Sequence, residues 1–162
     1  MKKIKLILLT IALLLFIISC NFPISPNGSV SSKLKKIYDK PKIEDLAGTW
    51  EVDSFSYEFI KESYDIGNKK VELTLNENGT FIVKNVPDFN DLNKENKNKL
   101  FEVEGKWKLN NYKNKEWNLY INSKKNYGLT SVFYLYIKEG ELIIWDFIGD
   151  PDSGNRLLFT KK

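Results

Sequence analysis

The feature that most constrains the fold of this chain is an alternation of apolar and charged residues within the run from Leu100 to Leu109. The large apolar side chains of Phe101, Val103 and Trp107 alternate with two glutamates and two lysines. Because a strand places successive side chains on opposite faces of a sheet, this pattern predicts a strand with one buried and one solvated face. Such strands are typical of antiparallel sheets.

Strand patterns recur along the rest of the chain. We predict seven further strands, at residues 50–59, 71–75, 80–86, 117–121, 132–137, 141–148 and 156–160. Asn78-Gly79 and Lys138-Glu139-Gly140 favour tight hairpins, and the polar stretch 87–99 predicts a surface loop or a short helix. Eight successive antiparallel strands can close and leave no free edge. We therefore predict an all-β fold with a single eight-stranded up-and-down barrel, with an open sandwich as the alternative.

The first twenty residues resemble a bacterial lipoprotein signal. Three lysines precede the uncharged stretch 6–18, which is shorter than the roughly 20 apolar residues that span a bilayer. The sequence Ile17-Ile18-Ser19-Cys20 resembles a lipobox. The resemblance implies cleavage after Ser19, a diacylglyceryl thioether on Cys20, and the membrane as a partner through that lipid. An ordinary signal peptide would instead need small residues at positions −3 and −1, and no such pair stands out.

The residues after Cys20 bear on localisation. Asn21 stands where an aspartate resembles an inner-membrane retention signal in diderm bacteria, and no acidic cluster resembling a surface-export signal follows. We expect lipid anchoring at the outer membrane, on its periplasmic face. In another kind of envelope we expect the extracytoplasmic side of the cell membrane.

Composition excludes several classes of site. Histidine is absent and Cys20 is the only cysteine, so Ser–His and Cys–His nucleophile systems and the usual zinc and copper sites are excluded. Removing the three signal lysines leaves a formal charge near +1, which gives no argument for nucleic-acid binding. We expect no cofactor, no metal and no enzymatic activity.

The mature chain divides into two parts. Residues 20–45 are a tether rich in Pro, Ser and Asn, followed by a short helical segment in which Leu34, Ile37 and Tyr38 have helical spacing before Pro41. Residues 46–162 form the barrel domain.

The start of that domain carries a second resemblance. Leu46-Ala47-Gly48-Thr49-Trp50 resembles the Gly-x-Trp signature of lipocalins and lipocalin-like domains. The resemblance implies that Trp50 lies across the closed base of the barrel and that an arginine of the last strand packs over it. Arg156, the only arginine, opens the last predicted strand. Gly48, Trp50 and Arg156 are thus expected to close the barrel. The ending 148–156 is also similar to that of small lipocalin-like lipoproteins from Bacteroidetes.

Aromatic residues suggest a binding site. Residues 132–137 and 141–148 are apolar on both faces, which is more aromatic surface than a small barrel interior can hold. Either the N-terminal segment covers the outer face, or that face contacts a partner, or the rings line a ligand cavity. Our candidates for a ligand or contact patch are Trp107, Tyr134 and Trp145. We expect a lipid-anchored envelope protein that binds a small apolar ligand in or at the barrel. The alternative is a protein-interaction module, an inhibitor or an assembly subunit, with a filled core.

Carboxylates offer weaker candidates. Asp146 interrupts an apolar run, and we expect it to face outward, since a solitary buried charge is rarely tolerated. An inward Asp146 would indicate a site. Asp150 and Asp152 precede Gly154 in what we interpret as a turn rather than a calcium loop. Glu102 and Glu104 alternate with apolar residues, so we expect them on a solvated face rather than in a hydrolase.

Overall fold

The computed structural model describes residues 34–91, 95–112, 116–148 and 154–162. These ranges contain nine strands and two short helices. In chain order they are β1 (Leu34–Lys36), α3 (Ile43–Leu46), β2 (Gly48–Val52), α4 (Ser54–Ser63), β3 (Glu72–Leu75), β4 (Thr80–Val86), β5 (Phe101–Tyr112), β6 (Glu116–Ser123), β7 (Val132–Lys138), β8 (Glu141–Phe147) and β9 (Arg156–Lys161).

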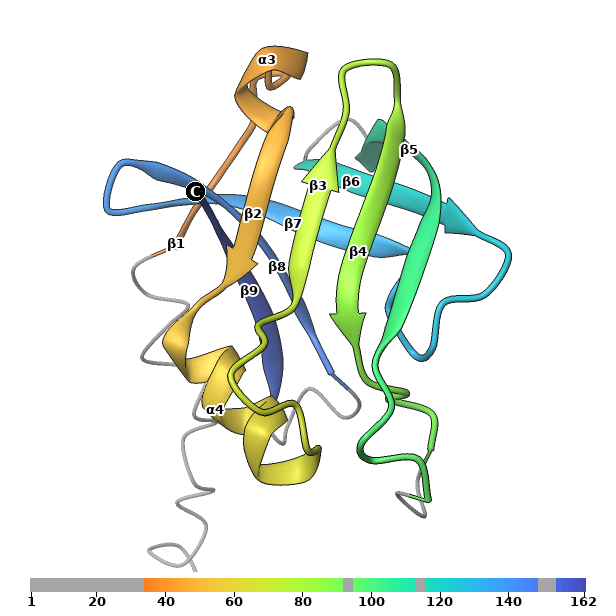
Figure 1. The fold of residues 1–162 in the computed structure, drawn as a ribbon. Coiled ribbons are helices and arrows are strands. Elements are labelled where there is room, and N and C mark those ends of the chain that lie inside the picture. Colours follow the sequence, from red (N-terminus) through yellow and green to blue (C-terminus); the bar gives the residue numbers. More distant parts are fainter. Residues whose placement is uncertain (1–33, 92–94, 113–115, 149–153) are drawn as a thin grey trace, which may run out of the picture.

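Strands β2 to β9 form a closed antiparallel barrel. Each strand pairs with its neighbours along the order β7-β6-β5-β4-β3-β2-β9-β8, and β8 pairs back with β7 to close the ring. The predicted eight-stranded barrel is therefore confirmed. Figure 1 shows α3 beside the β3–β4 hairpin at one end and α4 at the other. Leu46 of α3 and Ile60 of α4 are fully buried in the core.

Two tight turns lie where the sequence predicts hairpins. Lys138 pairs with Glu141, so the β7–β8 hairpin has a two-residue loop. Glu139 and Gly140 both have positive φ, 54° and 92°, as a type I′ turn requires. In the β3–β4 hairpin Gly79 has a φ of 78°. These local requirements explain why the two hairpins could be predicted.

The predicted strand over residues 50–59 is wrong in its second half. Strand β2 ends at Val52, and Asp53 is the N-cap of α4, where its side chain accepts a hydrogen bond from the Ser56 backbone N–H at 2.8 Å. This is ordinary N-cap geometry. The alternating apolar residues Phe55, Tyr57 and Phe59 therefore belong to a helix.

The predicted helical turn at Leu34, Ile37 and Tyr38 is also wrong, and the N-terminal helix lies at Ile43–Leu46 instead. Strand β6 pairs with β7 only over residues 132–134. The rest of that β7 edge is taken by β1, with Leu34 opposite Lys138 and Lys36 opposite Tyr136. A free strand edge offers unpaired backbone groups, and pairing there overrides the helical spacing.

The barrel interior is filled by side chains. Its largest fully buried members include Trp50, Phe81, Phe133 and Phe159. The Phe133 and Phe159 rings meet edge to face with centroids 6.0 Å apart. A small barrel of eight strands commonly has such a packed core.

Candidate functional site: an aromatic face outside the barrel

A second apolar cluster lies outside the barrel core. Ile143, Trp145 and Leu158 are buried in it, and the partly buried residues Leu34, Tyr134, Tyr136 and Phe147 pack against them. The neighbouring residues Leu135, Ile144 and Phe159 belong to the core. Because side chains alternate along a strand, six of the seven residues of the second cluster lie on the outer side of β7, β8 and β9, and Leu34 joins them from β1. We call these seven residues the aromatic face.

Trp145 is the centre of the aromatic face. Its ring lies 6.3 Å from Tyr134, 5.7 Å from Tyr136 and 4.7 Å from Phe147, measured between centroids. The contacts with Tyr136 and Phe147 are edge to face. The strand register explains the contacts, since Tyr134 and Leu158 flank Trp145 directly on the two neighbouring strands. Cross-strand aromatic pairs of this kind stabilise a sheet.

The structure brings together two of the three predicted patch residues. Tyr134 and Trp145 are in the aromatic face, whereas Trp107 belongs to the barrel core and is 6% exposed. The Trp107 indole N–H donates to the Asn76 carbonyl at 2.9 Å. Trp107 is therefore a core residue at the β3–β4 hairpin, on the other side of the sheet from the aromatic face.

Two buried donors near this face have no acceptor among the described residues. They are Trp145 Nε1 and Arg156 Nε. Arg156 lies directly opposite Phe147 across β8 and β9, and its guanidinium carbon is 3.9 Å from the centroid of the Phe55 ring of α4. Burial lowers the pKa of Arg156, while the charge of Asp53 acts in the opposite direction. A buried donor without an acceptor is unusual and calls for a partner.

The expected packing of Arg156 over Trp50 is wrong. Lys161, not Arg156, lies opposite Trp50, with its Nζ 5.6 Å from the ring centroid. Arg156 is at the other end of β9, near α4. The register of β2 with β9 thus places Lys161, and not Arg156, over the Trp50 indole.

Gly48 and Trp50 lie together at the α3 end. Trp50 is fully buried, and its indole N–H donates to the Leu46 carbonyl at 2.8 Å. Gly48 has a φ of 127°, and a Cβ there would come within 3.1 Å of the Lys161 side chain. A side chain at Gly48 would therefore be both strained and crowded.

The border of the aromatic face with β1 is polar. Lys36 forms an ion pair with Glu116 at the start of β6. The Trp117 indole N–H donates to the Tyr38 carbonyl at 3.1 Å. Burial raises the pKa of Tyr136, and the charge of Glu116 adds to the effect. These contacts tie β1 to β6 as well as to β7.

Asp146 does not face outward as expected. It alternates with Ile144 and Ile148, which both pack in the barrel core, so its carboxylate projects to the inner side near the α4 end. Burial raises the pKa of Asp146, against hydrogen bonds from the Phe147 backbone and the Thr130 side chain. The outward interpretation is therefore wrong. The carboxylate is only half-buried, and the two hydrogen bonds partly satisfy it.

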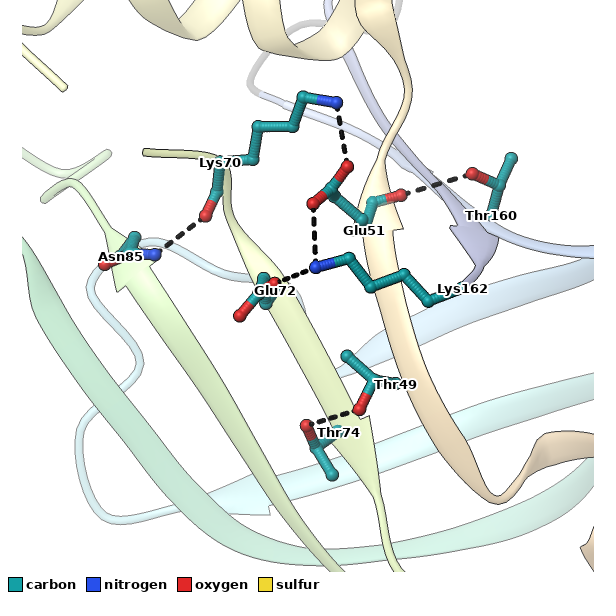
Figure 2. A network of polar contacts seen from close by, with 8 residues as sticks. All are labelled: Thr49, Glu51, Lys70, Glu72, Thr74, Asn85, Thr160 and Lys162. Atoms are coloured by element: carbon teal, nitrogen blue, oxygen red, sulfur yellow. Dashed lines mark hydrogen bonds and ion pairs between the residues drawn. The ribbon is translucent and has the colours of Figure 1, made fainter. Parts of the chain in front are cut away.

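Two further carboxylates, those of Glu51 and Glu72, lie on the outer side of β2 and β3. Figure 2 shows Glu51 bound by Lys70 and Lys162, and Glu72 bound by Lys162. The Lys70 ammonium, 2.8 Å away, holds the pKa of Glu51 below its ordinary value. Both carboxylates are thus engaged in ion pairs, which suits a surface network and not a general acid.

Two hollows open on the described surface. One is a groove of about 880 Å³ along β4, β5 and the end of β6, where Glu102, Glu104 and Lys106 line it beside Tyr127. It opens where β6 stops pairing with β5 at Gly105. A smaller hollow of about 550 Å³ lies against α4 at Phe55 and Phe59. Neither includes a residue of the aromatic face.

Several predicted features lie wholly or partly outside the described residues. They are the signal peptide, Cys20, and Asp150 and Asp152 of the predicted turn. Within the described ranges, no three acidic or cysteine side chains are grouped to hold a metal ion. No helix of that part of the chain is both long and apolar enough to cross a membrane.

Comparison of the whole sequence with protein-family models and with curated proteins gave no match, and comparison with solved structures gave none either.

Proposed function

We propose that this chain is a non-enzymatic, lipid-anchored envelope protein that binds another envelope protein through the aromatic face. The observation that carries the proposal is the position of Trp145 and its aromatic neighbours outside a barrel whose interior is already filled. Aromatic clusters with a polar rim are typical of protein contact sites. A filled core favours this function over transport of a ligand inside the barrel.

The position of Leu34 supports the same function. Leu34 packs in the aromatic face. Cys20, the proposed lipid site, precedes it by fourteen residues, a reach of at most about 50 Å when fully extended. A lipid on Cys20 would keep the face close to the membrane and favour partners in the same envelope. We place the protein at the outer membrane, facing the periplasm.

A second candidate is a small apolar ligand bound outside the core. The groove along β4 and β5 has a volume in the range of ligand pockets, which is about 300–1,000 Å³. Phe81, Val103 and Tyr127 supply its apolar part, but charged side chains line much of the rest. Native mass spectrometry of the gently purified mature protein tests this candidate. An adduct removed by organic extraction would support it.

Site-specific photo-crosslinking in the native envelope tests the first candidate. A photoreactive phenylalanine analogue replaces Tyr136 in the full chain, and a matched variant carries it at Thr74 on the outer side of β3, far around the barrel. We expect one discrete protein adduct with the probe at Tyr136 and none at Thr74. The adduct should weaken when Tyr134 and Phe147 are changed to serine. Equal crosslinking from both positions would refute a contact centred on the aromatic face.

A further inference from the structure

The groove along β4 and β5 contains a free strand edge. Strand β6 pairs with β5 only from Gly105 onward, with Ser123 as its last partner, and Figure 1 shows β6 turning away from β5 beyond that point. Residues 101–104 of β5 stay paired with β4 on one side. On their other side no strand of the described chain pairs with them. Such an edge offers backbone donors and acceptors to an incoming strand.

The hydrogen-bond pattern of β5 shows which backbone groups face the groove. The Trp107 N–H donates to the Gly79 carbonyl at 2.8 Å, so the main-chain groups of Trp107 point toward the β3–β4 hairpin. Because these groups alternate along an antiparallel strand, those of Val103 also point toward β4, whereas those of Glu102 and Glu104 point into the groove. Each of these two glutamates thus offers one N–H and one C=O.

The side chains around this edge restrict which strand can pair with it. Phe81 and Val103 line the groove from the core side, and each is only 1% exposed. An added side chain directed at them has little room, so a small residue is favoured opposite Val103. Glu102 and Glu104 are exposed on the outer side of the same strand. Residues directly opposite them are favoured when they carry a positive charge.

Two other occupants suit the groove less well. A second copy of this chain, paired antiparallel through the same residues, would place Glu102 opposite Glu104, and like charges directly opposite destabilise a sheet. A flat aromatic ligand would stack on Tyr127. That ring is already stacked on Phe101 with centroids 3.9 Å apart, and Lys125 Nζ lies 4.5 Å from its centroid. The groove is therefore better suited to a basic strand from another protein.

We propose that residues 101–104 bind an extended segment of another protein as an added strand, with basic side chains opposite Glu102 and Glu104 and a small side chain between them. Main-chain hydrogen bonds supply affinity in this mode of recognition, and alternate side chains supply specificity. Four extended residues span about 13 Å. Lys124 lines the groove as well, so a continuous run of positive charges is disfavoured. The inference goes beyond the proposed function, because it adds a second binding site and assigns a peptide, not a small apolar ligand, to this groove.

Fluorescence anisotropy with a labelled synthetic peptide tests the charge pattern. The probe has the core Thr-Lys-Ala-Lys-Thr between two glycines, and the control peptide has glutamate in place of both lysines. We expect the purified protein to bind the lysine peptide at least tenfold more tightly at low salt. Equal binding of the two peptides would overturn the proposal.

Charge reversal locates the binding site of the probe. Glu102→Lys combined with Glu104→Lys should reverse the preference between the two peptides. The matched control is Glu58→Lys combined with Glu62→Lys, which changes the net charge equally at exposed positions of α4 and should preserve the preference. A preference that survives reversal in β5, or that reverses in the control, would place binding elsewhere.

Backbone methylation of the probe separates strand addition from charge attraction. In the added strand the lysine N–H groups donate to the Glu102 and Glu104 carbonyls, whereas the alanine N–H points away from β5. N-methylation at either lysine should therefore weaken binding about tenfold. N-methylation at the alanine should change it less than about twofold. Equal weakening at both kinds of position would contradict strand addition.

Amide hydrogen exchange gives an independent readout on the protein. Bound peptide should slow exchange of the Glu102 and Glu104 amides and leave that of the Val103 amide, which faces β4, unchanged. Slowing at all three amides, or at none, would refute the added strand. Dimerisation without peptide that slows the same two amides would assign the edge to a second copy. The crosslinking test at Tyr136 examines the aromatic face, so the two proposals can fail independently.

Discussion

The hydroxyl of Ser56 accepts a hydrogen bond from the backbone N–H of Leu158 at 3.0 Å, across 102 positions of sequence. Ser56 is fully buried, and the Leu158 carbonyl in turn accepts from the Asp53 N–H at 2.8 Å. Both main-chain groups of one residue in β9 are therefore used by the first turn of α4. This exchange fixes where α4 sits against the last strand.

Ser56→Ala should lower the free energy of unfolding by about 1–3 kcal/mol, because it leaves the Leu158 N–H buried without an acceptor. Urea unfolding followed by circular dichroism measures the change. Ser54→Ala is the matched control, since Ser54 is exposed in the same helix and should shift stability by less than about 0.5 kcal/mol. Equal effects of the two substitutions would show that the hydrogen bond adds nothing.

Trp50→Ala should lower the free energy of unfolding by about 3–5 kcal/mol, because it empties a fully buried indole site. Trp50→Phe keeps most of the ring and loses the hydrogen bond to Leu46, so its effect should be smaller. Thermal unfolding compares the two variants. If Trp50→Ala melts at the same temperature as the parent chain, Trp50 does not help to close the α3 end of the barrel.

Gly105→Ala should destabilise the barrel by about 1–3 kcal/mol or more, because a Cβ there would collide with the Asn122 carbonyl oxygen and press on the Phe81 ring. Gly67→Asn is the control, since Gly67 has open space around it and a φ of 57° that asparagine tolerates. Denaturant unfolding should separate the two clearly. A tolerated Gly105→Ala would mean that β5 and β6 can move apart at this point.

Asp146→Asn should stabilise the protein at pH 7, because burial penalises the ionised carboxylate and raises its pKa. A raised pKa in the folded state means that Asp146 favours folding in its protonated form, below the pKa of the unfolded chain. That contribution is lost as pH rises through the folded pKa. The advantage of the Asp146→Asn variant over the parent chain should therefore shrink as the pH falls toward about 4. A melting-temperature difference independent of pH would contradict this assignment.

The contribution of Glu51 to stability should depend on pH in the opposite direction. The pKa of Glu51 is lowered by Lys70 and Lys162, so its contribution to stability is present above the unfolded pKa and is lost as pH falls through the lower folded pKa. Glu51→Gln should cost less than about 1 kcal/mol at pH 7, because the ion pairs are largely exposed. Unfolding at low and high salt is the measurement. A cost that persists in molar salt would rule out an electrostatic origin.

The barrel could be predicted because its signals are local. The alternation from Leu100 to Leu109 defines one buried face without reference to any other strand. Helix α4 was missed because Phe55, Tyr57 and Phe59 alternate with polar residues as they would in a strand. The signal that favours a helix over a strand here is the N-cap at Asp53. The β1 pairing could not be predicted, since it depends on where β6 leaves β7.

The candidate site was only partly predictable for a related reason. In β8, residues on both faces are apolar, so a period of two cannot tell which of Trp145 and Asp146 points inward. Their sides are fixed by pairing with β7 and β9. For Trp107 a signal did exist, because its flanking lysines mark the opposite face as solvated and its own face as core.

The position of β1 also determines how the domain responds to a mechanical load. Among the described residues, a pull from the N-terminal side reaches β1 first, where three residue pairs with β7 and the Lys36–Glu116 ion pair resist it. Strands β2 to β9 close the ring without β1. Separation of β1 from β7 would therefore lengthen the free chain and absorb work before the ring itself carries tension. Detachment of β1 would leave the barrel closed.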